Sequence, residues 1–330
     1  MTSAPARITA KQRPADRIFR GGATFAGSLI LVILAAVAIF LIAQSIPAFT
    51  VDPAEIKGSP DSFWTYVGPL VFGTVWAAAI ALVIAVPLAI GIALFISHYA
   101  PRRLAQGLGY VIDLLAAVPS VVFGLWGGGV LAPAIQPAYG WLAENASWFP
   151  LFAPETAEPG SGIATVSGTG RTILTVGIVL AVMILPIITA LCREVFLQTP
   201  TLHEEAALAL GATRWEMIRM AVLPYSRAGI TGAAMLGLGR AIGETIAATL
   251  LIGNAADIGK SIFSQGYTLA AVIANEFGEA ANNKLHTGAL IAAGLVLFVV
   301  TLLVNAIARA IVNRGTKRQA TGGAAMGVGA

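Results

Sequence analysis

Residues 69–98 read PLVFGTVWAAAIALVIAVPLAIGIALFISH and contain no Asp, Glu, Lys or Arg. A helix needs about 20 mostly apolar residues to cross the hydrocarbon core of a bilayer, and this stretch is long enough. Its apolar residues follow one another without the alternation of apolar and polar positions that is typical of membrane β-strands. The stretch therefore predicts a membrane-spanning α-helix.

The composition of the whole chain agrees with this prediction. Of its 330 residues, 57% are hydrophobic and 11% are charged, and the mean hydropathy is +0.82. Soluble domains have about 45–50% apolar and about 25% charged residues. These values exclude a soluble enzyme and a disordered protein. The single cysteine, Cys192, excludes a disulfide within the chain.

Hydropathy predicts an all-α membrane protein with six spans. The expected spans are about 22–47, 69–98, 106–131, 172–195, 229–253 and 286–311. The ends of the chain, 1–19 and 315–330, are expected to be disordered tails, and 20–314 is expected to form one membrane domain.

The distribution of basic residues predicts the orientation of these spans. Fifteen of the 20 Lys and Arg residues fall on one side, four fall on the other, and Arg240 falls within a span. Basic residues concentrate in the cytoplasmic loops of membrane proteins. We therefore expect both termini in the cytoplasm. An odd number of spans would destroy this charge asymmetry, so the distribution of basic residues also supports six spans.

The external segment 132–171 is rich in Pro, Gly and aromatic residues. It is interpreted either as a solvated or interfacial loop, or as a docking surface for an external partner.

No motif for catalysis or nucleotide binding is complete. The stretch from Gly253 to Ser261 resembles a phosphate-binding loop, but five residues separate its glycines where the motif has four. The three histidines lie far apart and lack the spacing of metal ligands. We therefore expect no catalytic residue, metal, cofactor or nucleic-acid partner. If the chain pumps a solute across the membrane, the energy for that work would come from another chain.

The segment 198–228 is more structured than a simple connection between spans requires. Thr199-Pro200 predicts the start of one helix. Gly211 can adopt the left-handed conformation that ends a helix. Thr213 and Glu216 form a capping box that opens a second helix. Leu223-Pro224 is expected to end it, so two short helices would meet near a right angle at Gly211.

Apolar residues of this segment are expected to lie outside the bilayer. They are Leu208, Leu210, Trp215 and Met217. Exposed apolar patches mark a partner or a membrane surface. The segment is therefore either an interfacial helix on the lipid or a peg inserted into a groove of a cytoplasmic partner.

The spacing Glu205-Ala206-Ala207-x3-Gly211-x9-Ala221-x-Leu223-Pro224 resembles the EAA signature of ABC-importer permeases. That family usually has Ile at the position of Ala221. The resemblance implies a type I ABC-importer permease-like fold, with this loop as a coupling helix seated on a separate ATPase subunit. The residues that would couple to the ATPase are Glu205, Ala206, Ala207, Gly211, Trp215, Leu223 and Pro224.

Two charges lie inside the fifth expected span, where charged side chains are costly. Arg240 and Glu244 are four residues apart, so on a continuous helix they share one face within pairing reach. One interpretation is a structural salt bridge. The other is an anion site, because the planar Arg fork donates two parallel hydrogen bonds to an oxyanion.

The third expected span contains a helix-breaking pair, Pro119 and Ser120, followed by several glycines. Irregular backbone at membrane depth is tolerated only beside protein or a water-filled cavity. The pair is interpreted either as a fixed kink for packing or as a flexible gate that lines the transport pathway.

Three stretches together resemble the PstC family of phosphate-specific permeases: residues 117–127, 238–245 and 266–275. The resemblance implies phosphate transport across a bacterial plasma (inner) membrane, with Arg240, Glu244, Ser120 and Pro119 along the pathway. It also implies a second, PstA-like permease, a PstB-like cytoplasmic ATPase dimer that uses the ATP, and a PstS-like external phosphate-binding protein.

Three alternatives remain open at this point. The chain could be a permease for another oxyanion, such as sulfate or molybdate, because an Arg–Glu pair does not discriminate among them. It could be a self-contained channel or ion-coupled carrier. It could be an intramembrane enzyme, although no set of nucleophile or metal ligands converges in the sequence.

Overall fold

The computed structural model describes residues 14–50, 62–153, 155–156, 164–165, 169–259, 261–280 and 283–326. This part of the chain is mostly helical, as the sequence predicts. In chain order its elements are α1 (Pro14–Thr50), α2 (Phe63–Leu94), the π-helical turn η2 (Phe95–Tyr99), α3 (Arg102–Ala116), α4 (Ser120–Trp126), the π-helical turn η3 (Gly127–Leu131), α5 (Ala132–Asn145), β1 (Glu155–Thr156), β2 (Ala164–Thr165), α6 (Ile173–Leu197), α7 (Thr201–Ala209), α8 (Arg214–Met217), the π-helical turn η4 (Ile218–Val222), α9 (Leu223–Ile242), α10 (Ile246–Leu251), α11 (Leu269–Ala280) and α12 (Lys284–Met326). The two short strands pair antiparallel.

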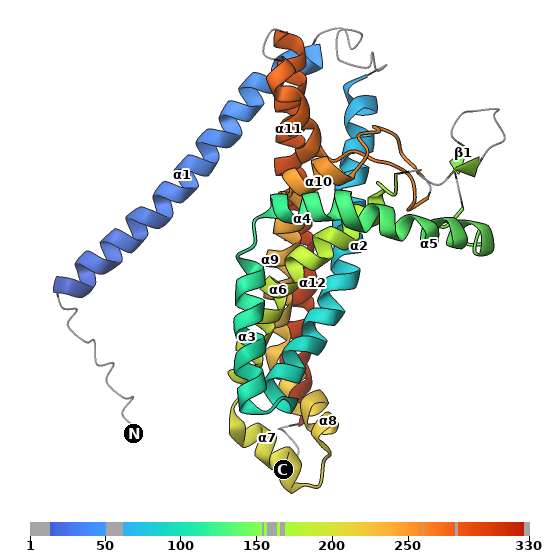
Figure 1. Ribbon diagram of the computed structural model, residues 1–330. Helices are drawn as coiled ribbons and strands as arrows, with labels where there is room; N and C mark the ends of the chain where they lie inside the picture. The colour runs from blue at the N-terminus through green and yellow to red at the C-terminus, as the bar shows by residue number, and fades with distance from the viewer. Residues whose placement is uncertain are drawn as a thin grey trace.

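The helices α2 and α6 pack against each other at the centre of a bundle (Figure 1). Every fourth residue of α2 from Ala77 to Ala93 is an alanine with at most 1% of its surface exposed. On α6, a Cβ atom added to Gly177 would overlap Ile80. Small residues let helix backbones approach closely, which is the main source of attraction between helices in lipid. This small-residue seam holds the core together.

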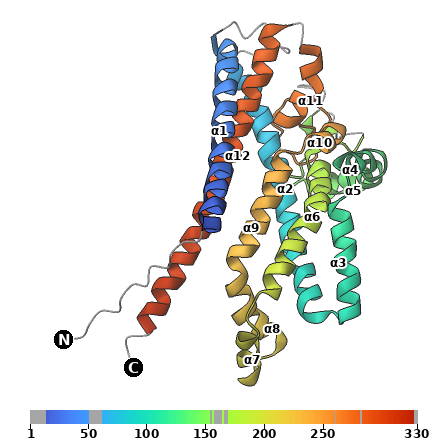
Figure 2. The same cartoon turned by 90° about the vertical axis from the view of Figure 1, so that its left-hand side faces the viewer.

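Two further helices complete the bundle around the core. Figure 2 shows α9 beside α6, and α12 running the length of the molecule. The helix α1 packs near its C-terminal end on the start of α12, where Gly288 lies close to Pro47 and Ala48. Away from this contact α1 leaves the bundle (Figure 1), and its apolar side chains are exposed.

The third expected span, 106–131, is wrong as one continuous helix. The helix α3 ends at Ala116, and α4 begins at Ser120 after Pro119, whose backbone is extended at φ −61° and ψ 140°. A proline disfavours helical backbone for the residue before it, and that residue is Val118. After this break α4 and α5 run across the direction of the bundle (Figure 1).

The fifth expected span, 229–253, is also broken. The helix α9 ends at Ile242, with Gly243 as its cap, and α10 begins at Ile246. The break lies beside the predicted charged residues, so it affects the candidate site directly.

The expected number of six spans is not confirmed. In the part of the chain that the structure describes, five helices are long and apolar enough to cross a membrane. They are Ile18–Phe49, Phe63–Tyr99, Ser120–Asn145, Ile173–Leu197 and Lys284–Ala310. One of the five, Ser120–Asn145, is the segment that runs across the bundle.

The expected tails and external segment also contain ordered elements. Residues 14–19 lie in α1 and 315–326 lie in α12, whereas 1–13 and 327–330 lie outside the described residues. Within 132–171, α5 is a helix that packs through the buried Tyr139 on Phe263.

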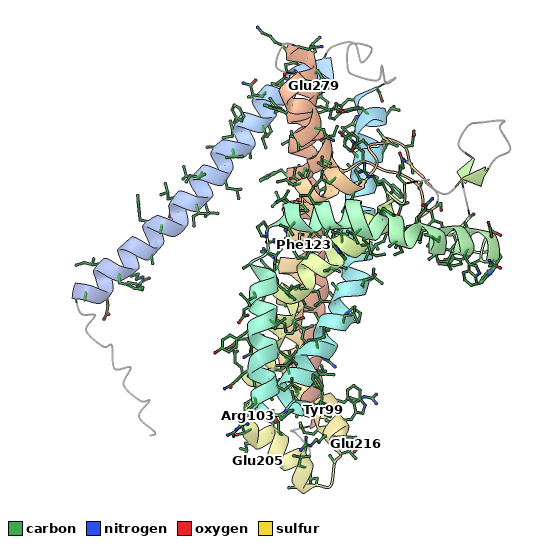
Figure 3. The ribbon with its side chains drawn as sticks, in the orientation of Figure 1. Tyr99, Arg103, Phe123, Glu205, Glu216 and Glu279 are labelled. Carbon is green, nitrogen blue, oxygen red and sulfur yellow. The ribbon has the colours of Figure 1, made fainter. Side chains whose placement is uncertain are left out.

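The bundle has two distinct ends. One end carries the α2–α3 connection and the α7–α8 segment, and the other carries α11 and the start of α12 (Figure 1). Figure 3 places Arg103, Glu205 and Glu216 at the first end, far from Glu279 at the other. We call residues 199–224 the elbow, and the first end the elbow end. Two connections predicted to share the cytoplasmic side, between α2 and α3 and around α7 and α8, therefore lie at one end. Which compartment that end faces stays a prediction, as does the orientation of the termini.

Candidate functional site

Arg240 and Glu244 do not form the expected pair. Arg240 lies in the last turn of α9, whereas Glu244 follows the end of that helix. The Glu244 carboxylate accepts a hydrogen bond from the backbone N–H of Ala247, with Oε1 3.1 Å from the nitrogen. Within the described residues no ion pair joins the two side chains. Because the helix ends at Gly243, the carboxylate caps the short helix α10 instead.

Arg240 lines a pocket of about 620 Å³ between three helices. The walls are Ile187 of α6, the stretch of α9 from Gly232 to Arg240, and Asn305 with Arg309 of α12. Arg240 and Arg309 have no ion-pair partner among the residues that the structure describes. The pocket therefore collects two unneutralised guanidinium groups and one amide, a combination suited to an oxyanion.

Sequence reasoning missed Asn305 and Arg309 as site residues. Arg309 lies near the end of the expected span 286–311, and it was counted only among the basic residues of the cytoplasmic side. One signal was available: a polar and a basic residue four positions apart share one face of an otherwise apolar helix. No sequence pattern indicates that this face meets Arg240.

Pro119 and Ser120 lie at the break between α3 and α4, and the described lining of the pocket does not include them. Instead, α4 packs on α10, the helix that Glu244 caps. A Cβ atom added to Gly124 would lie 3.0 Å from the Cα atom of Ala247. The two broken spans therefore meet each other through α4 and α10. Whether Pro119 and Ser120 act as a gate stays a prediction.

The elbow has the turn that the sequence predicts at Gly211. This residue has a φ of +84°, in the left-handed region, and α7 ends just before it. The capping box is also confirmed, because Thr213 N donates to Glu216 Oε2 at 2.8 Å and Glu216 N donates to Thr213 Oγ1 at 3.4 Å. Thr213 Oγ1 also donates to Glu216 Oε2, and the two bonds that Thr213 donates to this carboxylate hold the pKa of Glu216 below its usual value.

The predicted helix end at Leu223-Pro224 is wrong. The chain continues from α8 through the turn η4 into α9, and Pro224 lies in the first turn of α9. A proline lacks the N–H that would bond to the preceding turn. In the π-helical turn η4 the backbone N–H groups bond to carbonyls five residues earlier in the chain instead of four. Leu223 N accordingly donates to Ile218 O. The helix therefore passes the proline without a stop.

Most of the expected apolar surface of the elbow is exposed. Leu210 is 90% exposed and Trp215 is 56% exposed, and Leu208 is also exposed. Met217 is the exception, because it is buried in the core.

The residues of the EAA spacing divide between the two sides of α7. Glu205 and Ala206 are exposed, whereas Ala207 is half-buried and packs on the core. The elbow thus presents a free apolar tip at the end of the bundle. A coupling role for these residues stays a prediction.

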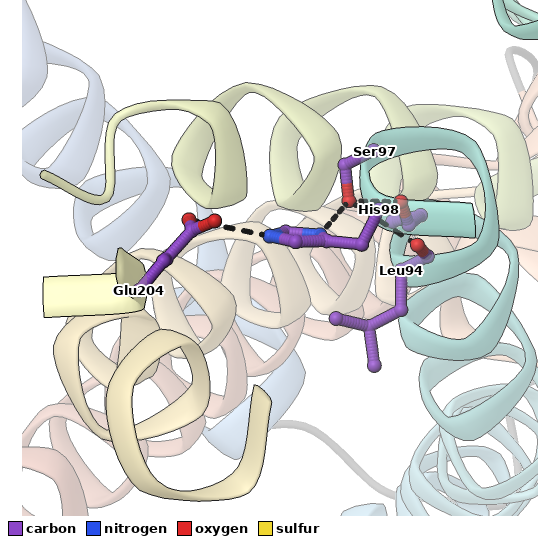
Figure 4. A network of polar contacts seen from close by, with 5 residues as sticks. Leu94, Ser97, His98 and Glu204 are labelled. Atoms are coloured by element: carbon purple, nitrogen blue, oxygen red, sulfur yellow. Dashed lines mark hydrogen bonds and ion pairs between the residues drawn. The ribbon is translucent and has the colours of Figure 1, made fainter. Parts of the chain in front are cut away.

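One contact at the elbow was not predicted. His98, in the turn η2 at the end of α2, has its Nε2 atom 3.4 Å from Oε1 of Glu204 in α7. Figure 4 shows the imidazole between Glu204 and Ser97, whose hydroxyl lies 2.7 Å from Nδ1. The two partners are 106 residues apart in the sequence, so no local pattern could indicate the contact.

Known proteins resemble this chain in sequence. The chain matches the family model described as "Binding-protein-dependent transport system inner membrane component" over residues 85–317. It is 48% identical over 318 residues to the "Phosphate transport system permease protein PstC 2" of Mycobacterium bovis, covering 93% of this chain and 95% of that protein. It is 47% identical over 307 residues to the "Phosphate transport system permease protein PstC" of Mycobacterium leprae, covering 91% of this chain and 93% of that protein.

A solved structure of a bacterial ABC transporter involved in the import of the acidic polysaccharide alginate also resembles this fold. The similarity has a TM-score of 0.52 at 17% identity and covers 92% of this chain and 99% of that one. At this identity the similarity concerns the fold alone.

Proposed function

Because the chain belongs to the family of binding-protein-dependent transport system inner membrane components, we propose that it is the permease subunit of an ATP-driven phosphate importer. The family and the apolar helices make it a multi-pass bacterial membrane protein. The observation that carries the proposal is the 48% identity to a protein named as a phosphate transport permease, which extends over 93% of the chain.

The elbow supports a role in coupling. Its apolar tip is free, and its shape is fixed by the left-handed turn at Gly211 and by the capping box at Thr213. An apolar tip beyond the spans is suited to a groove on another chain. In the proposed assembly that chain is a PstB-like ATPase, which uses the ATP. The permease itself carries no cofactor.

In the proposed cycle, the elbow transmits movement from the ATPase to the bundle. ATP binding closes the ATPase dimer and draws the elbows of this chain and of a PstA-like second permease together. The bundle then opens outward and receives phosphate from a PstS-like binding protein. Hydrolysis of ATP resets the bundle inward. Such a movement is a two-state change that the ligands bias through their unequal affinities for the two states.

The pocket supports an anionic substrate. Arg240 lines it without a neutralising carboxylate among the described residues. An unpaired charge between membrane helices usually faces a cavity or a substrate path. In this proposal Arg240 lies on the path of the anion. Glu244 keeps the break between α9 and α10 in shape by capping α10.

The test is uptake of labelled phosphate by bacterial cells that lack the native gene and carry this chain. Restored uptake that excess sulfate and molybdate do not inhibit would support the proposal. Restored uptake of sulfate or molybdate instead of phosphate would contradict the substrate. Purification of the tagged chain should also recover an ATPase and a second permease, and transport by the purified chain alone would contradict coupling.

A further inference from the structure

The pocket beside Arg240 is lined by polar residues that were not predicted from the sequence as pathway residues. Its lining combines Arg240 with Asn305 and Arg309, and the other lining side chains are aliphatic, methionine or glycine. A guanidinium group carries five N–H donors and no acceptor, and an amide adds two donors and one oxygen acceptor. No carboxylate contributes to the described lining. The pocket therefore offers many donors and a positive charge to whatever occupies it.

The three polar residues converge from two helices. Asn305 and Arg309 are four residues apart, so they share one face of α12. Arg240 approaches from α9, whose wall between Gly232 and Arg240 extends about 12 Å along the helix axis at 1.5 Å per residue. A Cβ atom added to Gly232 or Gly239 would meet nothing within 4 Å, so this wall is open.

The two arginines lie on helices that run in opposite directions. The helix α9 runs from the elbow toward α10, and α12 runs in the opposite direction (Figure 1). Arg240 is therefore remote from the elbow. Arg309 is the penultimate residue of the apolar stretch Lys284–Ala310, which runs toward the elbow end of the bundle (Figure 1). An anion that left the level of Arg240 in that direction would next meet Arg309.

We propose that Asn305 and Arg309 form, with Arg240, a binding site for a doubly charged tetrahedral oxyanion, and that Arg309 is the station from which the anion leaves at the elbow end. This rests on the proposed function and adds two residues to its pathway. Two arginine forks balance two negative charges.

Asn305 provides discrimination between anions. Its amide is the one described lining side chain with an oxygen acceptor. Hydrogenphosphate carries a hydroxyl that needs such an acceptor, whereas sulfate has no proton to donate. A site built to bond a hydroxyl of its ligand rejects the analogue that lacks it. Replacing the amide by an aliphatic side chain should therefore narrow the preference for phosphate over sulfate.

The first experiment measures phosphate uptake by cells that carry full-length variants. We expect Arg309→Gln to lower the maximal rate by about tenfold, because a charged hydrogen-bond donor is lost. Arg309→Lys should retain more of the rate, and Asn305→Leu should let sulfate compete. The matched control is Arg227→Gln, which removes an exposed arginine of α9 outside the described lining.

The outcomes separate this inference from the proposed function. If the unchanged chain does not restore phosphate uptake, the proposed function fails. If it does restore uptake, and Arg309→Gln transports as well as Arg227→Gln, the inference alone is overturned.

A second experiment tests binding in the purified full chain, where the native Cys192 is buried. A thiol at Asn305→Cys should react faster with an anionic than with a cationic methanethiosulfonate reagent, and inorganic phosphate should slow that reaction. Met235→Cys, in the same pocket, serves if Asn305→Cys does not accumulate. The chain is tested in zwitterionic and in anionic lipid discs. Protection by anionic lipid without protection by phosphate would assign the pocket to lipid headgroups and overturn the proposal.

Discussion

His98 Nε2 lies 3.4 Å from Glu204 Oε1 and joins the end of α2 to the elbow. The side chains are only 9% and 23% exposed. The hydroxyl of Ser97 donates to the carbonyl of Ala93 at 2.8 Å, and its oxygen lies 2.7 Å from His98 Nδ1. The imidazole is therefore held between Ser97 at the end of a span and Glu204 in the proposed coupling helix.

Replacing His98 by Ala should loosen this connection. A hydrogen bond contributes about 1 kcal/mol, or roughly fivefold in an equilibrium constant. We expect reduced phosphate uptake for each ATP hydrolysed, while the amount of assembled complex stays unchanged. The measurement is the ratio of uptake to ATPase activity in proteoliposomes.

The control for this prediction is His203→Ala. His203 lies next to Glu204 in α7, and its side chain is exposed. It should leave the ratio at its original value. Equal ratios for His98→Ala and His203→Ala would show that the contact does not transmit movement.

The elbow should depend on glycine at position 211. Its φ of +84° costs a residue with a side chain roughly 1–2 kcal/mol, and a β-branched residue more. Gly211→Val should therefore uncouple ATP hydrolysis from uptake. Gly211→Asn should largely preserve coupling, because Asn tolerates this conformation. Identical coupling in both variants, measured as above, would contradict the role of the turn.

The capping box should make the elbow sensitive to acid. The hydrogen bonds from Thr213 lower the pKa of Glu216 in the folded state. Their stabilisation is therefore present above the unfolded pKa of the carboxyl and is lost as the pH falls through the folded pKa. Amide exchange of residues 211–219, corrected for intrinsic rates, should show less protection below about pH 4.

Two variants check the origin of this effect. Glu216→Gln keeps a neutral acceptor in the capping box, so its protection should not change with pH in this range. Thr213→Ala should have low protection at every pH, because it loses the side-chain cap. Unchanged protection of the original chain in acid would argue against the box as the source of stability.

Arg240 is predicted to act on transport and not on assembly. Losing a charged hydrogen bond costs about 1.5–3 kcal/mol, so Arg240→Gln should reduce phosphate uptake by roughly tenfold or more. Recovery of partner subunits with the tagged chain should be normal, because no described ion pair depends on Arg240. Normal uptake by a well-assembled variant would remove Arg240 from the pathway.

The seam between α2 and α6 should be intolerant of one added methyl group. Gly177→Ala would overlap Ile80, and overpacking of this kind costs about 1–3 kcal/mol. We expect a lower apparent melting temperature in detergent. Gly91→Ala, where an added Cβ meets nothing within 4 Å, should leave it unchanged or raise it. Equal melting temperatures would mean that the helices shift apart without cost.

The candidate site was only partly accessible from the sequence. Arg240 could be singled out because a charge inside an apolar stretch is rare and costly. Its expected pairing with Glu244 assumed a continuous helix. The helix ends before Gly243, and the carboxylate of Glu244 instead accepts a hydrogen bond from the backbone N–H of Ala247. The contact of His98 with Glu204 joins residues 106 positions apart, beyond the reach of any spacing rule.

By itself the sequence determined the helical membrane class, the left-handed turn at Gly211 and the capping box at Thr213. These features depend on hydrocarbon thickness and on backbone sterics within a few residues, and both can be evaluated along the chain. The tertiary structure alone decided that α4 runs across the bundle after Pro119, and that Asn305 and Arg309 meet Arg240 in one pocket. Such meetings depend on how distant helices pack side by side, which small residues such as Gly177 permit but do not direct.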